Sequence, residues 1–278
     1  MQQRNQPLLS VARGHTQAAS CAAGLALIVP TLREADNIRP LLARIRAALD
    51  PCGIAYEVIV VDDDSRDGIE AIVAEVVRED PRIRLIVRKG EQGLAGAVLR
   101  GWAECDAPLL GVMDADLQHP PELLPELWAA LSAGADLVVG SRYASGGSLQ
   151  GWKPSRHLIS RLAVWMTLPV QRSGLRARDP MSGFFLVRRS CIDGIALQKS
   201  GFKILLEILS RGAIGSVVEV PFTFGRRYAG RSKANLRVAV DYLILLVRLY
   251  LQRGRTPSAS QQAAALAALE KTREVVRS

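Results

Sequence analysis

The sequence predicts an α/β fold with a mainly parallel central sheet that is flanked by helices. Three observations support this prediction. Short apolar runs alternate with longer helical patterns between positions 25 and 142, which is typical of repeated βα units. Acidic side chains directly follow several of the apolar runs, where such folds place their ligands. The 278 residues are 49% hydrophobic and 23% charged, which excludes a disordered or fibrous chain.

Five strands are expected in this region. Each run is mostly apolar and has the length of a strand that is buried on both faces. The runs cover positions 25–30, 57–61, 83–87, 108–113 and 136–139. Four segments between them have apolar residues at three- and four-residue spacing, which predicts helices at 38–49, 69–78, 94–104 and 122–131. These repeated βα units predict parallel strands that are joined by right-handed crossovers.

The charge of the chain predicts attraction to phosphate groups. The sequence has 36 Lys and Arg residues and 27 Asp and Glu residues, which gives a net charge of +9 and a pI near 9.8. The phosphates could belong to nucleic acid, anionic lipid or a nucleotide. Positions 142–189 hold nine basic residues and one acidic residue, and positions 226–255 hold eight and one. The basic segments therefore follow the acidic clusters along the chain.

Cysteine spacing and hydropathy limit the class of protein further. The four cysteines are far apart and form no Cys-x-x-Cys pair, so neither a zinc site nor a disulfide framework is predicted, which fits a reducing cytoplasm. Residues 1–24 lack the continuous apolar stretch of a secretory signal and are expected to be a flexible tail. The apolar run at 238–251 contains two charged residues and is shorter than the roughly 20 residues of a membrane-spanning helix.

Oxygen ligands for a metal ion follow the fourth predicted strand. Asp114, Asp116 and Gln118 supply two carboxylates and an amide, which suit Mg²⁺ or Mn²⁺. The alternative is an Asp-rich turn before the helix that begins near Pro120. Two carboxylates at one strand end repel each other unless they share a cation, which favours the metal site. The adjacent His119 could be a metal ligand or a base, but we favour a structural role or one that supports the metal ligands.

Acidic residues also follow the first two predicted strands. Glu34 comes after the first strand and Asp63 belongs to an Asp-Asp-Asp-Ser segment after the second. In isolation these residues would be interpreted as helix caps or first-turn acids. Their placement beside the predicted metal ligands suggests instead that they hydrogen-bond the base or ribose of a nucleotide. For the glycine-rich segment 90–96 we favour a tight entry into the next helix over direct phosphate binding.

These motifs, in this order, resemble the GT-A-type inverting glycosyltransferases of family 2, and among them the dolichol-phosphate (polyprenyl-phosphate) mannose synthases. The resemblance covers about 25–236. It is carried by Pro-Thr-x-x-Glu at 30–34, Val-Asp-Asp-Asp-Ser at 61–65, Met-Asp-Ala-Asp-Leu-Gln-His-Pro at 113–120, Gly-Ser-Arg-Tyr at 140–143, Asp-Pro-Met-Ser-Gly-Phe-Phe at 179–185, Gly-Phe-Lys-Ile-Leu-Leu-Glu at 201–207 and Val-Pro-Phe-Thr-Phe-Gly at 220–225, followed by Ser-Lys at 232–233. Leu32 and Arg33 replace the usual aromatic residue and Asn, and Arg231 replaces a usual acid.

The resemblance implies a Rossmann-like nucleotide-diphospho-sugar transferase that moves mannose from GDP-mannose to a polyprenyl monophosphate with Mg²⁺ or Mn²⁺. The implied lining of the nucleotide pocket is Pro30, Leu32, Glu34, Val61 and Asp63. Asp114, Asp116 and Gln118 would hold the cation, and Ala115 would approach the nucleotide sugar through its backbone. The implied surroundings of the donor and acceptor phosphates are Arg142, Arg156, Ser160, Arg227 and Lys233. The expected catalytic groups are Asp116, Arg142 and Arg227.

Two other functions fit parts of the pattern. The same fold and chemistry with UDP-glucose as donor would give polyprenyl-phosphate glucose. A non-catalytic basic module that binds nucleic acid or a membrane is disfavoured, because acidic strand ends repel phosphates unless a metal ion intervenes. We therefore expect no nucleic-acid partner.

The expected domain organisation is a tail at 1–24, a GT-A catalytic domain at 25–234, an amphipathic helix at 235–254 and a tail helix at 255–278. The amphipathic helix is strongly apolar with arginines near both ends, which suits an interfacial helix on anionic lipid. A core helix packed on the domain is the alternative. The chain is expected on the cytoplasmic face of a membrane as a peripheral protein. A small membrane subunit, such as some family members use, is a candidate partner.

Overall fold

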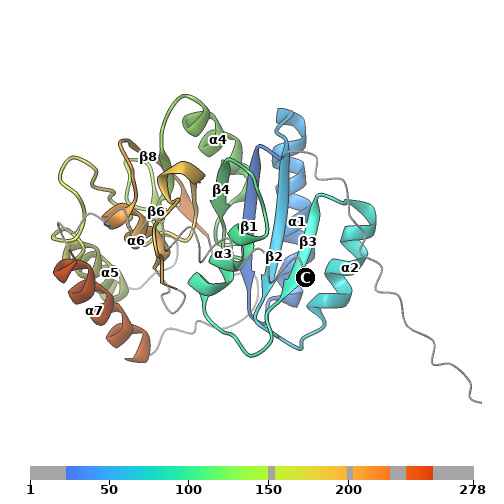
Figure 1. Ribbon diagram of the computed structural model, residues 1–278, viewed down its shortest axis with the longest axis horizontal. Helices are drawn as coiled ribbons and strands as arrows, with labels where there is room; N and C mark the ends of the chain where they lie inside the picture. Colours follow the sequence, from blue (N-terminus) through green and yellow to red (C-terminus); the bar gives the residue numbers. More distant parts are fainter. Residues whose placement is uncertain (1–22, 150–153, 199–202, 226–235, 253–278) are drawn as a thin grey trace, which may run out of the picture.

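The computed structural model describes residues 23–149, 154–198, 203–225 and 236–252, which form a seven-stranded sheet between two helical layers (Figure 1). The strand order is β3-β2-β1-β4-β7-β5-β8. The five predicted strands are β1 (Leu25–Thr31), β2 (Tyr56–Asp62), β3 (Ile83–Val87), β4 (Leu109–Val112) and β5 (Leu137–Ser141). They are mutually parallel in direction, which confirms the predicted mainly parallel sheet.

Four further strands were not predicted. They are β6 (Ser148–Leu149), β7 (Phe185–Arg188), β8 (Val217–Pro221) and β9 (Thr223–Phe224). Strand β7 lies between β4 and β5 and is antiparallel to both, whereas β8 extends the sheet parallel to β5. Strands β6 and β9 form a separate two-stranded sheet. The reversed β7 brings residues that precede a strand to the edge where the parallel strands end.

Helices cover both faces of the large sheet. The helices are α1 (Ala35–Leu49), α2 (Ile69–Glu79), α3 (Leu94–Ala103), α4 (Leu124–Ser132), α5 (Pro154–Met166), α6 (Ile204–Arg211) and α7 (Leu236–Leu251), with 3₁₀ turns at Asp50–Cys52, Pro121–Leu123 and Arg189–Cys191. The first four correspond to the predicted helices. Helices α1, α2 and α4 pack on one face of the sheet, and α3 and α6 pack on the other.

The alternation of side chains along β1 explains the two cores. Leu25, Leu27 and Val29 point into the core with α1, and Ala26 and Ile28 point into the core with α3. All five side chains are fully buried, because a strand between two helical layers has no face toward water. The continuous apolar run that predicted this strand therefore follows from its central place in the sheet.

Helix α7 packs against α5 at the end of the molecule beyond β8 (Figure 1). Its buried side includes Tyr242, whose hydroxyl donates a hydrogen bond of 2.5 Å to the carbonyl of Ala163 on α5. Leu245, Leu246 and Leu249 are buried in the same small core. One face of this helix is therefore packed on the domain. None of the helices in the described parts of the chain has both the length and the hydropathy that crossing a membrane requires.

The buried carboxyl of Glu207 on α6 should make stability depend on pH. Burial raises the pKa of this carboxyl although Gln198 N–H and Arg211 oppose the shift. The folded protein thus keeps the proton to higher pH than the unfolded chain, so the free energy of unfolding falls as pH rises through the raised pKa. We expect Glu207→Gln to raise stability above that range by on the order of 1 kcal/mol. Urea denaturation at pH 5 and pH 8 measures the effect.

The exposed Glu70 on α2 provides the control for this prediction. Glu70→Gln should leave the difference in stability between the two pH values unchanged. An equal gain from Glu207→Gln at both pH values would contradict the assigned role of burial.

Candidate active site

The candidate site lies at the carboxyl edge of the sheet, which is formed by the loops that follow β1, β2, β4 and β5 and by the loop that precedes β7. Val112, at the end of β4, pairs with Phe185, at the beginning of β7. The segment 179–184 therefore reaches the same edge as the acidic loops. Ligands of open α/β sheets bind at this edge.

Backbone strain is concentrated in three of these loops. Arg33, Asp64, Arg66 and Leu117 have φ values of 60°, 51°, 53° and 61°, and they are the non-glycine residues with positive φ among those that the structure describes. They follow β1, β2 and β4. Each such residue costs roughly 1–3 kcal/mol and persists where the surroundings impose it, which is common at ligand sites. The strain therefore marks the same edge as the acidic motifs.

The five residues predicted to line the nucleotide pocket come from β1, β2 and the loops after them. Pro30 and Val61 are direct partners in the β1–β2 register. The side chain of Val61 is fully buried in the core with α3, so this residue can face a ligand only through its backbone. Leu32 lies half-buried in the turn after β1, and Glu34 directly precedes α1. The structure brings these predicted residues together.

Asp63 is part of a buried ion pair. Its Oδ1 accepts a hydrogen bond of 2.9 Å from Nε of Arg88, and its Oδ2 accepts one of 2.8 Å from the backbone N–H of Gly93. Both Asp63 and Arg88 are almost fully buried. The carboxylate thus ties the loop after β2 to the turn that begins α3, where Gly93 has a φ of 118° that favours glycine. Sequence reasoning identified Asp63 but missed Arg88.

The predicted metal loop has a defined shape. Asp116 Oδ1 accepts a hydrogen bond of 3.1 Å from the Gln118 N–H, which closes the turn around the strained Leu117. Gln118 also exchanges two hydrogen bonds with Gly225, because its side-chain Nε2 donates to the Gly225 carbonyl at 2.9 Å and its backbone carbonyl accepts from the Gly225 N–H at 3.2 Å. Asp116 and Ala115 are buried, whereas the Asp114 side chain is 34% exposed.

This donor set fits a divalent cation that also binds phosphate. Within the described residues there is no cluster of three or more His, Cys, Asp or Glu side chains that could enclose a metal ion. A Mg²⁺ ion commonly takes only one or two protein carboxylates and completes its coordination with water and substrate phosphates. Two carboxylates and an amide oxygen on one loop, with Asp114 open to solvent, match that type of site.

His119 is better suited to a structural role than to proton transfer. It is buried against the rings of Phe184, Phe222 and Phe224, with centroids 5.3–5.6 Å away. Its Nδ1 accepts a hydrogen bond of 3.4 Å from the Asp114 N–H, which requires an unprotonated Nδ1. Burial lowers the pKa of His119 to about 4. The ring is therefore neutral at physiological pH and supports the backbone of the loop that follows β4.

Arg142 is held in a fixed orientation by Asp179. Its Nε and Nη2 donate hydrogen bonds of 2.7 Å to the two carboxylate oxygens of Asp179, which is fully buried. The backbone N–H of Arg142 donates to the same carboxylate at 3.0 Å. The guanidinium also lies 5.3 Å from the ring centroid of Phe224. Of the five N–H donors of an arginine, two are used by Asp179, so the fork can present others to a phosphate.

Other predicted phosphate ligands are placed only in part. Ser160 on α5 forms a hydrogen bond of 2.6 Å with the Tyr143 hydroxyl, next to Arg142. Arg227 and Lys233 lie outside the described residues, as does the side chain of Arg156. These three assignments stay predictions.

Lys203 and Asp179 are site residues that the sequence analysis did not select. Lys203 Nζ donates a hydrogen bond of 3.3 Å to the Met181 carbonyl. Burial and the charge of Arg142 lower its pKa, whereas Asp114 and Asp179 act in the opposite direction, so all four groups share one electrostatic environment. Both residues belong to segments that carry the family resemblance, at 179–185 and 201–207. Their place in these two motif segments is the feature of the sequence from which they could have been selected.

Comparison with known proteins places the chain in a family. Residues 26–195 match the sequence profile described as Glycosyl transferase family 2. The chain belongs to this family. The resemblance to family 2 that the motifs indicate is thereby confirmed.

Several curated relatives are similar over most of the chain. The dolichol-phosphate mannosyltransferase of Pyrococcus furiosus is 42% identical over 233 residues, which cover 83% of this chain and 64% of that protein. The chain thus spans less than two thirds of that relative. The dolichol-phosphate mannosyltransferase of Saccharomyces cerevisiae is 40% identical, with 81% and 86% covered. The polyprenol monophosphomannose synthase of Mycolicibacterium smegmatis is 34% identical, with 77% and 83% covered.

Solved structures confirm the GT-A type of fold. The mannosyl-3-phosphoglycerate synthase of Rubrobacter xylanophilus superposes with a TM-score of 0.60 at 18% identity, covering 85% of this chain and 78% of that one. The glucosyl-3-phosphoglycerate synthase of Mycobacterium tuberculosis gives 0.61 at 20% identity, with 91% and 88% covered. At these identities the likeness concerns the fold.

The close approach of Gly183 to Asp114 predicts a sharp mutational effect. A Cβ atom at Gly183 would lie 2.7 Å from Asp114 Oδ2, so Gly183→Ala must displace that carboxylate. We expect the rate of sugar transfer to fall about tenfold or more, because small displacements of positioning groups are costly to catalysis. Initial rates with nucleotide-sugar donor, together with the thermal midpoint of unfolding, measure the effect.

Gly225→Ala is the matched control at the same edge. A Cβ there has no neighbour closer than 3.9 Å, so activity should stay within about twofold of the unmodified chain. Equal losses in the two variants would refute the role given to the Gly183–Asp114 contact.

Proposed function

We propose that the chain transfers mannose from GDP-mannose to a polyprenyl (dolichyl) monophosphate, giving polyprenyl-phosphate β-mannose. Two relatives at 40–42% identity are named dolichol-phosphate mannosyltransferases. The observation that carries the proposal is the meeting of an acidic loop and a fixed guanidinium at one edge. Arg142 is held by Asp179, and Asp114 lies against Gly183, four residues further along the same segment.

The electrostatics of the site suit a reaction between two phosphate-bearing substrates. A lipid phosphate and a sugar diphosphate repel each other unless positive charge is placed between them. Arg142 supplies a bidentate fork whose orientation is set by Asp179, and Lys203 adds a compact charge nearby. Arg156, Arg227 and Lys233 are the further cations that we assign to this role. Holding both phosphates in place lowers the barrier through proximity and charge neutralisation.

The proposed reaction is a direct displacement. A phosphate oxygen of the acceptor attacks C1 of mannose, the bond between C1 and the diphosphate oxygen breaks, and GDP leaves with the electron pair. The second pKa of an alkyl phosphate is roughly 6, so the attacking oxygen is ionised near neutrality and no strong base is required. This agrees with the buried, neutral state of His119.

A divalent cation, Mg²⁺ or Mn²⁺, would be held by Asp114, Asp116 and Gln118. When bound, it would supply positive charge to the leaving diphosphate. Gln118 is oriented for this role, because its Nε2 is bound to Gly225 and its Oε1 is the end that a cation can use. A glucosyl-3-phosphoglycerate synthase with this fold has been solved in complex with Mn²⁺ and UDP, which supports the use of a divalent cation.

The test uses polyprenyl phosphate, labelled GDP-mannose and Mg²⁺ or Mn²⁺, and detects a lipid-linked sugar. We expect product formation that EDTA abolishes, and competition by unlabelled GDP-mannose but not by UDP-glucose. Asp116→Ala should lower turnover at least about a hundredfold without changing the thermal midpoint, because it removes a charge from the metal site. The exposed Asp193→Ala serves as the control.

Two outcomes would contradict the assignment. Efficient competition by UDP-glucose would show that the donor is UDP-glucose and the product polyprenyl-phosphate glucose. Leu32, which replaces the family's usual aromatic residue in the predicted nucleotide pocket, is compatible with such a change of donor. Normal metal-dependent turnover in Asp116→Ala would remove this aspartate from the mechanism.

The acceptor lies in a bilayer, and we propose that α5 and α7 rest on that surface. Their outer faces expose a set of large apolar side chains with exposed fractions of 47–71%: Leu158, Ile159, Leu162, Trp165, Val240, Leu243, Ile244, Val247, Tyr250 and Leu251. Helix α5 also carries Ser160, which reaches Tyr143 beside Arg142. A helix with an apolar face, an exposed Trp and flanking arginines suits the membrane interface. The location that we propose is peripheral, on the cytoplasmic face.

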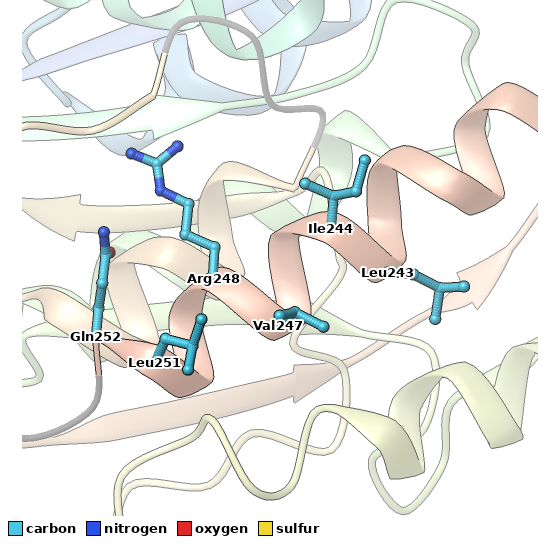
Figure 2. Close-up of a pocket in the computed structure, with 6 residues that line it drawn as sticks. All are labelled: Leu243, Ile244, Val247, Arg248, Leu251 and Gln252. Carbon is cyan, nitrogen blue, oxygen red and sulfur yellow. The ribbon is translucent and has the colours of Figure 1, made fainter.

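Figure 2 shows the apolar hollow on α7 that belongs to this surface. Its volume is about 540 Å³, and it is lined by Leu243, Ile244, Val247, Arg248, Leu251 and Gln252. Leu243, Val247 and Leu251 lie along the front and lower side of the helix in this view, whereas Ile244 and Arg248 extend upward from it (Figure 2). Acyl chains could fill such a hollow while the charged groups remain at the level of lipid phosphates.

Charge on this surface should weaken binding to vesicles. The double variant Trp165→Glu and Ile244→Asp removes two exposed apolar groups and adds two negative charges, so we expect affinity for anionic phospholipid vesicles to fall about tenfold or more. Cosedimentation with vesicles measures binding. Transfer to a short-chain, water-soluble polyprenyl phosphate should be retained. Val218→Asp on β8 is the control, and an equal loss there would contradict the assigned surface.

A further inference from the structure

Glu34 occupies the position just before α1, yet it does not cap that helix. Its side chain makes no capping hydrogen bond to the first backbone N–H groups. The N–H of Ala35 instead donates a hydrogen bond of 3.0 Å to Oδ2 of Asp67, which comes from the loop after β2. Capping is therefore supplied from another part of the chain. The orientation of the Glu34 carboxylate depends on a different interaction.

That interaction comes from Asn37, one turn further along α1. Its Nδ2 donates a hydrogen bond of 2.6 Å to Oε2 of Glu34. Asn37 is 1% exposed, and its buried Oδ1 has no hydrogen-bond partner among the residues that the structure describes. The opposite orientation of the amide would place its oxygen against the Glu34 carboxylate. The observed orientation therefore combines a hydrogen bond from Nδ2 to Glu34 with a buried acceptor, Oδ1, that is unsatisfied. A buried unsatisfied acceptor costs free energy, so this arrangement requires an explanation.

The backbone beneath Glu34 is fixed as well. Arg33 has the strained φ of 60°, and its N–H donates a hydrogen bond of 2.8 Å to Oγ of Ser65. Ser65 is in turn bound to the buried Asp62 through its N–H at 2.8 Å and through its hydroxyl. Glu34 is therefore positioned through its main chain from the loop after β2 and through its side chain from Asn37.

We propose that Asn37 is a positioning residue for the donor nucleoside, acting through Glu34. This inference rests on the proposed function. The N–H groups of a base and the hydroxyls of a ribose bind a carboxylate only when its lone pairs point toward them. Asn37 is too deeply buried to touch the nucleoside itself. It fixes the rotation of the Glu34 carboxylate at the edge of the nucleotide pocket, so the ligand does not have to order this side chain on binding.

The test measures binding of GDP with Mn²⁺ by titration calorimetry and the steady-state constants for GDP-mannose. We expect Asn37→Ala to raise Kd and KM about five- to tenfold while kcat changes less than about twofold, because the reacting atoms are not touched. Asn37→Asp should raise them further, since it replaces the donor by a second carboxylate. The neighbouring, exposed Asp36→Asn should leave all three constants unchanged.

A double-mutant cycle separates positioning from a purely structural role. In the Glu34→Ala background, adding Asn37→Ala should change Kd for GDP less than about twofold, because the group that Asn37 holds is already absent. A structural role would instead lower the thermal midpoint in both backgrounds and leave Kd unchanged.

The outcomes also separate this inference from the proposed function. If the unmodified chain binds GDP with Mn²⁺ and the Asn37 variants bind it equally well, the inference is overturned while the function stands. If the unmodified chain binds no nucleoside diphosphate, the proposed function fails and the inference fails with it. A similar Kd increase from Asn37→Ala with and without Glu34 would also overturn the inference, because the two residues would then act independently.

Discussion

The reversed direction of β7 is the constraint on which the candidate active site depends. A sheet that is parallel throughout brings only the residues after its strands to the carboxyl edge. Because β7 runs antiparallel between β4 and β5, the segment before it reaches the same edge and places Asp179 beside Arg142 and Gly183 beside Asp114. Acidic and basic groups that are far apart in sequence therefore meet there, and the buried Asp179 keeps the guanidinium in one orientation.

The acidic edge of a basic protein follows from the same arrangement. The carboxylates at this edge are distributed among different partners: Asp63 is paired with Arg88, Asp62 is hydrogen-bonded by Thr31 and Ser65, and Asp179 is paired with Arg142. These carboxylates stabilise the loops. Asp114, which keeps a third of its side chain exposed, differs from them because it remains accessible to solvent. The edge thus combines a rigid set of internal ion pairs with an open acidic position.

Much of the fold could be predicted from the sequence, because many of its strands and helices have a hydrophobic pattern that can be recognised within the segment itself. The strand at 25–31 is a continuous apolar run since both of its faces are covered, and the helix at 69–79 has a clear apolar stripe. Strand β7 was not predicted, because Phe185–Arg188 has four residues and its direction is decided by pairing with strands distant in sequence. Helices α5 and α6 were missed as well. The first has an exposed apolar face, and the second has eight residues, most of them buried on all sides.

The residues of the candidate site also fall into those that the sequence predicts and those that only the structure reveals. Glu34, Asp63, Asp114 and Asp116 could be selected because each follows a recognisable strand. Lys203, Asp179, Arg88 and Asn37 could not, because their roles depend on contacts between loops or on the orientation of a single amide. The resemblance to a family pointed to segments that contain two of these residues, but only the structure gives their partners.

The exposed apolar face of α5 has a consequence for how the reaction would be observed. An enzyme that rests on a bilayer through this helix would meet its acceptor as a solution in two dimensions. Its rate would then follow the mole fraction of polyprenyl phosphate among the other lipids, and adding inert lipid would slow the reaction even though the amount of acceptor per volume of buffer stayed the same. Ser160 lies on the opposite side of the same helix and is hydrogen-bonded to Tyr143, the neighbour of Arg142. An acceptor phosphate that enters from that surface would therefore contact Ser160 close to Arg142.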